Sequence, residues 1–473
     1  MDTLYDRLRR YEASDYYGFH MPGHKRNTQR FGAGLPYGID ITEIEGFDDL
    51  HHPSGILKEC QEEASRLYGA EETRYLVNGS TAGILSAILG CTRKGDQVLV
   101  GRNCHKSVYH AIYMNELEPV YLYPGFRPDL QLNTELSVSA VQAALNEHSR
   151  IRAVILVSPT YDGVVSDIRG IAQAAHDRGI PLIVDEAHGA HFGFHPYFPE
   201  SAVRLGADVV IHSLHKTLPA LTQTALLHVS GHLADRERIF RYLDMLQSSS
   251  PSYVLMAGID RCVRLLRDGR RELFAPYVEE LERLRAGLGG MEHLFLAQTK
   301  RYDRSRLAIV TARAGMSGRE LYMRLLADYH LQLEMAAGSY ALAMTSVGDT
   351  REGLERLGRA LREIDSRAGA RGGGTEEPDP AAGALPVNEQ VFTIAGMEEE
   401  IRRGGRIARV PLEACAGHIA VSYVYLYPPG IPLAAPGERI SRETVRHLLD
   451  SRRQGFSLEG LEEEGNMKVW IHG

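Results

Sequence analysis

The feature that most constrains the fold is a pattern that recurs along the first half of the chain. A short apolar run ends in a polar turn, and helical sequence then generally follows. The runs begin at Tyr75, Gln97, Ala153, Ile180 and Asp208. Apolar strands that alternate with helices are typical of a mainly parallel, doubly wound sheet. We therefore predict an α/β fold built on such a sheet.

Polar side chains follow these predicted strands directly. They are Ser80, Thr81, His105, Thr160, Asp185, His188 and Lys216. In doubly wound sheets, ligands bind at the carboxyl ends of the strands. Because these strand ends share one edge of the sheet, we expect the side chains to converge on a single site.

Lys216 lies at the centre of the largely apolar stretch 211–229. An apolar setting favours the neutral amine of a lysine, and a neutral amine can attack an aldehyde. Lys216 is therefore a candidate Schiff-base lysine, and its neighbours Ser213 and His215 are candidate donors to a phosphate. The alternative is a lysine at a strand end whose amine simply reaches solvent.

The turn from Asn78 to Thr81 connects an apolar strand to an apolar helix. This arrangement places free backbone N–H groups and the hydroxyls of Ser80 and Thr81 at a helix N-terminus, which is a ready anion site. Taken alone, Ser80 and Thr81 are equally compatible with an ordinary N-cap.

The length of 473 residues exceeds what one hydrophobic core supports, so we expect more than one domain. Residues 1–55 are predicted to form an arm that lies on another domain or another subunit. Residues 56–290 would form the large domain, with a helix from Ile56 to about Gly69 and a long helical region reaching about Gly289. Residues 291–473 would form a smaller α+β C-terminal region, with a flexible low-complexity linker at 368–386.

Composition excludes several classes of function. A net charge of −8 argues against a nucleic-acid partner. The five cysteines are odd in number and lack metal-ligand spacing, which favours a reducing compartment. The first ten residues are too polar for a signal peptide, and no apolar run reaches the ~18 residues that span a bilayer. A cytoplasmic protein without a membrane segment is expected.

A metal site is not predicted either. The arm contains His20, His24, His51 and His52. Although His20 and His24 have the spacing of neighbours on a helix, the intervening Pro22 and Gly23 argue against that helix. No carboxylate–histidine metal motif is recognisable.

A set of motifs runs through the chain in order: HMPGHK, DDLHHP, NGSTAG, CHKS, SPTYDG, VDEAHGAH, HSLHKT, SSSPSY and YPPGIPLAAPGE. Together they resemble the bacterial ornithine/lysine/arginine decarboxylases, which are pyridoxal-phosphate enzymes with the aspartate-aminotransferase fold (fold type I). The resemblance covers nearly the whole chain. It is to the short members, which lack the N-terminal wing domain of the large acid-inducible enzymes.

The resemblance implies a role for each matching residue. Lys216 would hold pyridoxal 5'-phosphate, Asp185 would pair with the pyridinium N–H, and His105 and Ala187 would pack on opposite faces of the ring. The remaining cofactor-binding positions are Gly79, Ser80, Thr81, His188, Ser213 and His215. Ser248 and Ser249 match a position that reaches the phosphate of the neighbouring subunit, which implies a homodimer with shared active sites. Alternatively, Asp185 is a surface carboxylate and the two serines form an ordinary turn before Pro251.

The reaction implied is decarboxylation of a basic amino acid, with arginine first and lysine or ornithine next. His215 and Lys216 are candidate acids for protonation at Cα. A cationic substrate tail would need an acidic partner. Glu438 is the first candidate, and the alternatives are Glu43, Glu45, Asp48 and Asp49, each of which could instead be a solvated surface charge. Ser422 occupies a position where we expect relatives to carry an acid, which leaves the exact substrate open.

Two rival functions remain at this point. One is another reaction of the same cofactor and fold, such as transamination or β-elimination. Transaminases of this fold usually bind the α-carboxylate with an arginine of the small domain, for which Arg306 or Arg409 could be proposed. The other rival is a catalytically idle homologue that serves as a binding protein. It predicts damage to the lysine, the aspartate or the phosphate loop, and none is seen.

Overall fold

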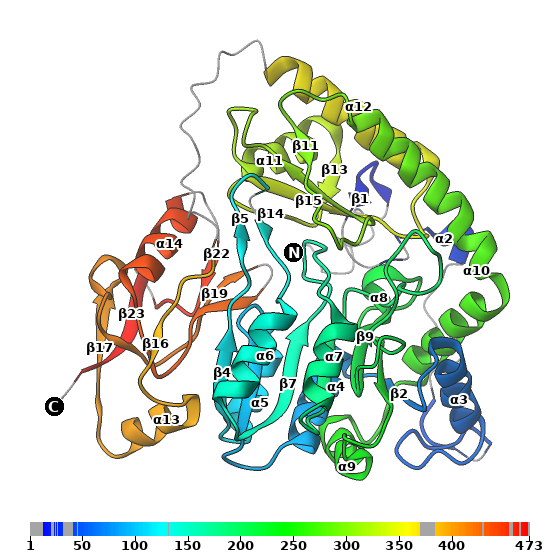
Figure 1. The fold of residues 1–473 in the computed structure, drawn as a ribbon. Helices are drawn as coiled ribbons and strands as arrows, with labels where there is room; N and C mark the ends of the chain where they lie inside the picture. The colour runs from blue at the N-terminus through cyan, green and yellow to red at the C-terminus, as the bar shows by residue number, and fades with distance from the viewer. Residues whose placement is uncertain are drawn as a thin grey trace, which may run out of the picture.

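The computed structural model describes residues 13–19, 23, 25, 27–31, 41–44, 46–130, 132–368, 384–427, 430–453, 457–462 and 465–471. Most of the predicted linker at 368–386 lies outside these residues, and so do His20, His24 and Glu45. Figure 1 shows three units: a large domain, a smaller domain above it and a C-terminal unit at its side.

The large domain is built on a seven-stranded sheet with the order β2-β10-β9-β8-β7-β3-β4. The strands are β2 (Glu72–Leu76), β3 (Gln97–Gly101), β4 (Glu118–Leu122), β7 (Ile151–Val157), β8 (Leu182–Asp185), β9 (Val209–Ser213) and β10 (Ala225–Val229). β10 alone runs in the direction opposite to the other six strands of this sheet. The predicted doubly wound, mainly parallel α/β fold is therefore confirmed, although β4 and β10 are not predicted by the apolar runs.

Both faces of this sheet are buried, which explains why its strands are nearly continuous apolar runs. Successive strand residues alternate between the faces, so Ile183 belongs to one core while Leu182 and Val184 belong to the other. The first core also contains side chains of α4 (Gly79–Cys91), α5 (Lys106–Met114) and α9 (Arg236–Leu246). The second contains side chains of α6 (Val138–Glu147) and α7 (Ile168–His176).

The helix predicted from Ile56 is α3 (Ile56–Tyr68), and Gly69 ends it in the left-handed conformation. The long helical region is α10 (Tyr253–Leu288), which is interrupted by non-helical backbone at Gly269. Its apolar side packs into the core shared by the large and smaller domains.

The chain after residue 290 builds two separate sheets. The first has the order β11-β12-β15-β14 and consists of β11 (Phe295–Leu296), β12 (Arg306–Val310), β14 (Met335–Ala336) and β15 (Tyr340–Met344). It packs with α11 (Gly318–Tyr329) and α12 (Arg351–Ala368). Strand and helix therefore occur where the apolar patterns of this region predict them.

The C-terminal unit follows residue 384 and has its own core. Its sheets have the orders β16-β21-β18-β23-β17 and β20-β19-β22. The strands are β16 (Glu389–Gln390), β17 (Arg406–Pro411), β18 (Ile419–Ala420), β19 (Val424–Tyr427), β20 (Ile431–Ala434), β21 (Glu438–Arg439), β22 (Ser457–Glu459) and β23 (Asn466–Ile471), with α13 (Ile394–Arg402), η3 (Leu412–Ala414) and α14 (Arg442–Arg453). The unit contacts the large domain near α5, where the Tyr423 hydroxyl donates to the Tyr109 carbonyl.

The N-terminal arm lies on the smaller domain of its own chain. β1 (Tyr17–Phe19) adds a parallel strand to β13 (Leu331–Leu333). Further along, the Gly23 N–H donates to the His215 carbonyl at 2.6 Å, directly beside Lys216. A Cβ at Gly23 would lie 2.6 Å from the backbone nitrogen of Leu218, so only glycine permits this approach. The arm therefore helps to fix the segment that carries Lys216.

Candidate active site

The predicted site residues gather at the carboxyl edge of the large sheet. β8 ends with Asp185, β9 ends with Ser213, and the short helix α8 (Leu214–Thr217) carries His215 and Lys216. The turn after β2 leads into α4, and the loop after β3 leads to His105 at the start of α5. This convergence follows from the parallel strand directions.

The amine of Lys216 lies 3.0 Å from Nε2 of His188. Burial is the largest influence on the pKa of Lys216 and lowers it, and the charge of Arg306 acts in the same direction. The charges of Asp185 and Glu334 oppose this decrease. Lys216 thus has the depressed pKa that makes an amine nucleophilic.

Asp185 is 5% exposed, and its carboxylate accepts a hydrogen bond of 3.1 Å from the Ala187 N–H. Burial raises the pKa of Asp185, while Lys216 lowers it. The surface-carboxylate alternative for Asp185 is therefore not supported. Ala187 is buried beside it, with 4% of its surface exposed.

The predicted anion site brings two hydroxyls together. Ser80 Oγ and Ser213 Oγ lie 2.6 Å apart, although their residues are far apart in sequence. Gly79 has a φ of 74°, a conformation that favours glycine, at the first turn of α4. Thr81 follows it on the exposed side of the same turn. The arrangement presents hydroxyl groups and helix N–H groups that can donate hydrogen bonds to an anion.

His105 and His215 have defined hydrogen bonds. His105 caps α5, where its Nδ1 accepts from the Ser107 N–H. Burial, followed by the charge of Lys216, lowers the pKa of His105 to about 3, so the ring is neutral. His215 Nδ1 lies 3.1 Å from the Thr224 carbonyl and must donate to it, since a carbonyl only accepts.

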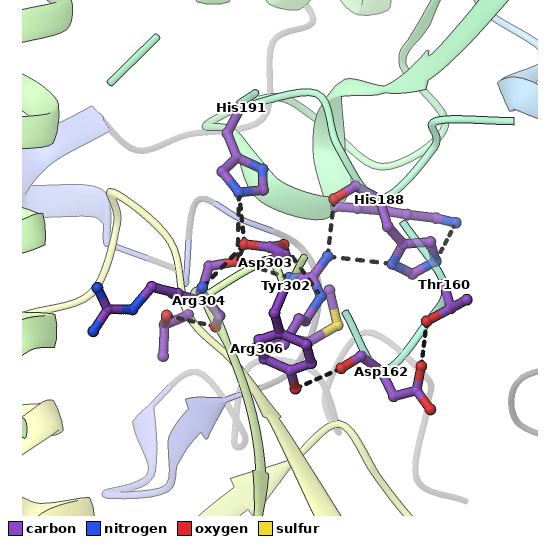
Figure 2. A network of polar contacts seen from close by, with 12 residues as sticks. Thr160, Asp162, His188, His191, Tyr302, Asp303, Arg304 and Arg306 are labelled. Atoms are coloured by element: carbon purple, nitrogen blue, oxygen red, sulfur yellow. Dashed lines mark hydrogen bonds and ion pairs between the residues drawn. The ribbon is translucent and has the colours of Figure 1, made fainter. Parts of the chain in front are cut away.

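A buried polar network joins the site to the smaller domain (Figure 2). Arg306 at the start of β12 is 0% exposed, and its Nη2 donates to the His188 carbonyl at 3.0 Å. Asp303 lies 3.9 Å from the Arg306 Nε and 3.2 Å from the His191 Nε2. Thr160 donates to Asp162 within the same cluster. His191 ends the VDEAHGAH motif, which was the available signal for it, whereas the sequence contains no local signal that Asp303 belongs near Lys216.

Tyr161 and Glu334 were also not predicted as site residues. The Tyr161 ring centroid lies 4.6 Å from that of His188, and its hydroxyl donates to Glu334. Tyr161 stands inside the SPTYDG motif, so its position in that motif was the available signal. Glu334, between β13 and β14, is a single acidic residue in a strand-rich region and offers none.

The acidic candidates for a substrate tail have other contacts. Glu438 is 2% exposed, and Arg102 Nη2 lies 3.3 and 3.2 Å from its two carboxylate oxygens. Asp48 accepts from the N–H groups that open α3, and Asp49 accepts from the His51 N–H. Glu43 is exposed. Glu438 is thus a buried ion-pair partner and not a solvated surface charge.

The other predicted positions lie apart from this network. Ser248 and Ser249 are exposed between α9 and α10, and the Ser248 carbonyl contacts His51 Nε2 at 2.8 Å. Arg409 lies on β17 of the C-terminal unit, 3.5 Å from Glu462. The Ser422 hydroxyl is buried without a hydrogen-bond partner among the described residues.

Within the described ranges, no cluster of His, Cys, Asp or Glu side chains has the geometry of a metal site. The described helices are each too short or too polar to cross a membrane.

Glu186, the residue after Asp185, forms a buried pair with His212. Glu186 Oε2 and His212 Nε2 are 2.6 Å apart, and both side chains are almost fully buried. Burial raises the pKa of Glu186 from its ordinary 4.5 to about 8 and lowers that of His212 from 6.5 to about 3. The folded pair therefore holds one proton throughout the range between these shifted values.

This pair predicts a pH optimum of stability. In the unfolded chain, the pair binds a second proton below pH 4.5 and loses its last proton above pH 6.5. The free energy of unfolding should then decrease on either side of that window, by about 1.4 kcal/mol per pH unit for each proton. Urea unfolding between pH 4 and 8 would measure this. Glu186→Gln should remove the decrease above pH 6.5, and an identical decrease in both proteins would contradict the assignment.

Comparisons with known proteins find matches over most of the chain. The family model "Orn/Lys/Arg decarboxylase, major domain" matches residues 2–311, and the model of the C-terminal domain matches residues 386–466. The "Uncharacterized protein YaaO" of Bacillus subtilis (strain 168) is 34% identical over 476 residues, which cover 98% of this chain and 96% of that protein. An arginine decarboxylase of Bacillus anthracis is 30% identical over 464 residues, covering 94% and 92%.

Among solved structures, the constitutive lysine decarboxylase of Escherichia coli superposes with a TM-score of 0.77. The match covers 100% of this chain and 82% of that chain at 20% identity, which establishes the shared fold.

Proposed function

The chain belongs to the Orn/Lys/Arg decarboxylase family, and we propose that it removes the α-carboxylate of a basic amino acid as CO2. Arginine is the first candidate substrate and would yield agmatine. Lysine and ornithine follow and would yield cadaverine and putrescine. The observation that carries the proposal is the partly buried Lys216, whose amine has a lowered pKa and lies at the same sheet edge as Asp185 and the Ser80–Ser213 hydroxyl pair.

The family implies pyridoxal 5'-phosphate as the cofactor, and the donor set of the site fits this group. Ser80, Ser213 and the first turn of α4 offer hydrogen bonds that a phosphate accepts. Thr81, His215 and His188 are assigned to the same binding site. Pyridoxal phosphate supplies an aldehyde that captures an amine and a ring that accepts the electron pair left when a bond to Cα breaks.

Each side chain then has a definite task. Lys216 would hold the cofactor through its amine, and Asp185 would pair with the protonated ring nitrogen. His105 and Ala187 would pack on the two faces of the ring. The neutral His105 adds no positive charge that would compete with Asp185. His215 or Lys216 would hold the proton that Cα receives once CO2 has left.

Arginine is placed first because a relative at 30% identity is named an arginine decarboxylase. Glu438 remains a prediction as the residue that binds the substrate tail. Its contacts favour a different task, because a carboxylate that is already neutralised by Arg102 attracts a second cation weakly. Ser248 and Ser249 are proposed to reach the partner subunit of a homodimer, a role supported by their exposure. A cytoplasmic location is proposed with the rest.

The two arginines proposed for the rival transamination already have other contacts. The Arg306 guanidinium is fully buried against His188, and Arg409 lies in the C-terminal unit beside Glu462. Product analysis tests the proposal directly. Separate incubations with arginine, lysine and ornithine should give an amine from one of them, whereas a keto acid would favour transamination.

Asp185→Asn is expected to lower kcat by on the order of 100-fold or more, because the ring nitrogen loses its anionic partner. The matched control is Asp208→Asn. Asp208 is also buried, but it directly precedes β9 and so lies at the edge of the sheet away from the site. Its carboxylate accepts a hydrogen bond from the Leu182 N–H. Steady-state kinetics with saturating pyridoxal phosphate would measure both. Equal losses in the two variants would show that Asp185 acts only on stability.

A further inference from the structure

Arg306 contacts His188 through one nitrogen of its guanidinium. Nη2 lies 3.0 Å from the His188 carbonyl oxygen and 3.4 Å from the His188 Nδ1. On the opposite edge of the His188 imidazole ring, Nε2 lies 3.0 Å from the Lys216 amine. We propose that Arg306 is a positioning residue that fixes the tautomer of His188, so that His188 donates its Nε2–H to a neutral Lys216. The inference rests on the proposed function of Lys216.

The direction of the hydrogen bonds follows from the chemistry of the three groups. A guanidinium only donates, so Nδ1 of His188 must be the acceptor. A neutral imidazole with an unprotonated Nδ1 carries its proton on Nε2. Because Nε2–H is then the donor towards Lys216, the amine must accept through its lone pair, and an ammonium group has none.

The other protonation states are disfavoured by the same contacts. If the ammonium form of Lys216 donated to Nε2, the proton of His188 would lie on Nδ1 and face a donor of Arg306. A doubly protonated His188 would place a third positive charge between Arg306 and Lys216. Burial and these two charges hold the pKa of His188 well below its usual range.

Arg306 is itself held in place by the smaller domain. Its Nε lies 3.9 Å from Asp303, which accepts from the Ser305 N–H and hydroxyl and contacts His191. Although burial opposes its ionisation, the charges of His191 and Arg306 lower the pKa of Asp303 to about 2. Asp303 is therefore anionic, and its contact with the Arg306 Nε helps to orient the guanidinium.

The consequence for Lys216 is a balance of charges. Asp185 and Glu334 favour the ammonium form, whereas burial and Arg306 favour the amine. Arg306 thus offsets the acidic groups of the site in two ways, through its charge and through the hydrogen-bond direction that it imposes on His188.

The tautomer can be measured in the apoprotein by ¹⁵N NMR of histidine-labelled protein, with His188 assigned by its loss in His188→Gln. We expect an unprotonated Nδ1 and a protonated Nε2. A protonated Nδ1, alone or together with a protonated Nε2, would overturn the proposal. This measurement needs no substitution of Arg306, so it decides the question even if such a variant does not fold.

The effect on Lys216 is tested by substituting Arg306. In folded Arg306→Gln apoprotein, His188 should lose its single tautomer. Acylation of Lys216, followed by peptide mass spectrometry across a series of pH values, should reach its half-maximal rate about one pH unit higher, as an increase of one pKa unit predicts. Arg304→Gln is the matched control, because the Arg304 guanidinium lies over the Tyr197 ring. An unchanged tautomer and an unchanged pH of half-maximal rate in Arg306→Gln would contradict the proposal. Neither readout involves CO2 release, so a failure of the proposed function would be recognised separately.

Discussion

Lys216→Ala is expected to lower the rate of CO2 release by on the order of 10⁴-fold or more, because the variant loses the amine that captures the cofactor and positions the reaction. Dialysis after loading with pyridoxal phosphate should also remove the cofactor absorbance from the variant and leave it in the native protein. Lys300→Ala, which alters an exposed lysine, serves as the control. A rate within tenfold of the native value would show that Lys216 is not the reactive lysine.

The second large effect concerns stability. Arg102→Met should lower the free energy of unfolding by about 3–5 kcal/mol, because it leaves the buried carboxylate of Glu438 without its counter-charge. Arg102 is 1% exposed, and its Nη1 also donates to the Pro432 carbonyl of the C-terminal unit. Urea unfolding would measure the loss.

The double variant Arg102→Met/Glu438→Gln separates charge from packing. It removes the unpaired charge while the amide can still accept from the Ala435 N–H, as Glu438 does. Most of the lost stability should return. If the double variant were no more stable than Arg102→Met, the unpaired charge could not be the cause.

The same residue tests the predicted tail site. If Glu438 joins the domains, the single variant Glu438→Gln should unfold at a lower urea concentration with an unchanged KM for arginine. An increase in KM at full stability would instead support the predicted role of Glu438 in substrate binding.

The fold was predictable because its signals are local. Each apolar run of the large sheet is short, is buried on both faces and ends in a polar turn, so both the strands and the edge that carries Lys216, Asp185 and Ser213 follow from the sequence. The antiparallel β10 was not predicted, because an apolar run carries no information about strand direction.

The part of the site that was not predicted depends on contacts between distant segments. Arg306 lies in the smaller domain, and only the folded chain places its guanidinium against His188. The pairing of Arg102 with Glu438 likewise joins segments 336 residues apart, and neither residue carries a pattern that identifies the other. Composition and periodicity describe neighbours along the chain, whereas these pairs are set by how the domains pack.

The most direct measurement is the fate of the carboxyl carbon of arginine. Native protein loaded with pyridoxal phosphate would be given carboxyl-labelled arginine, lysine and ornithine separately, and labelled CO2 and amine would be quantified together. The proposed function predicts equal amounts of labelled CO2 and the matching amine from at least one substrate, with arginine the fastest. Bound cofactor without labelled CO2 from any of the three would contradict basic amino-acid decarboxylation.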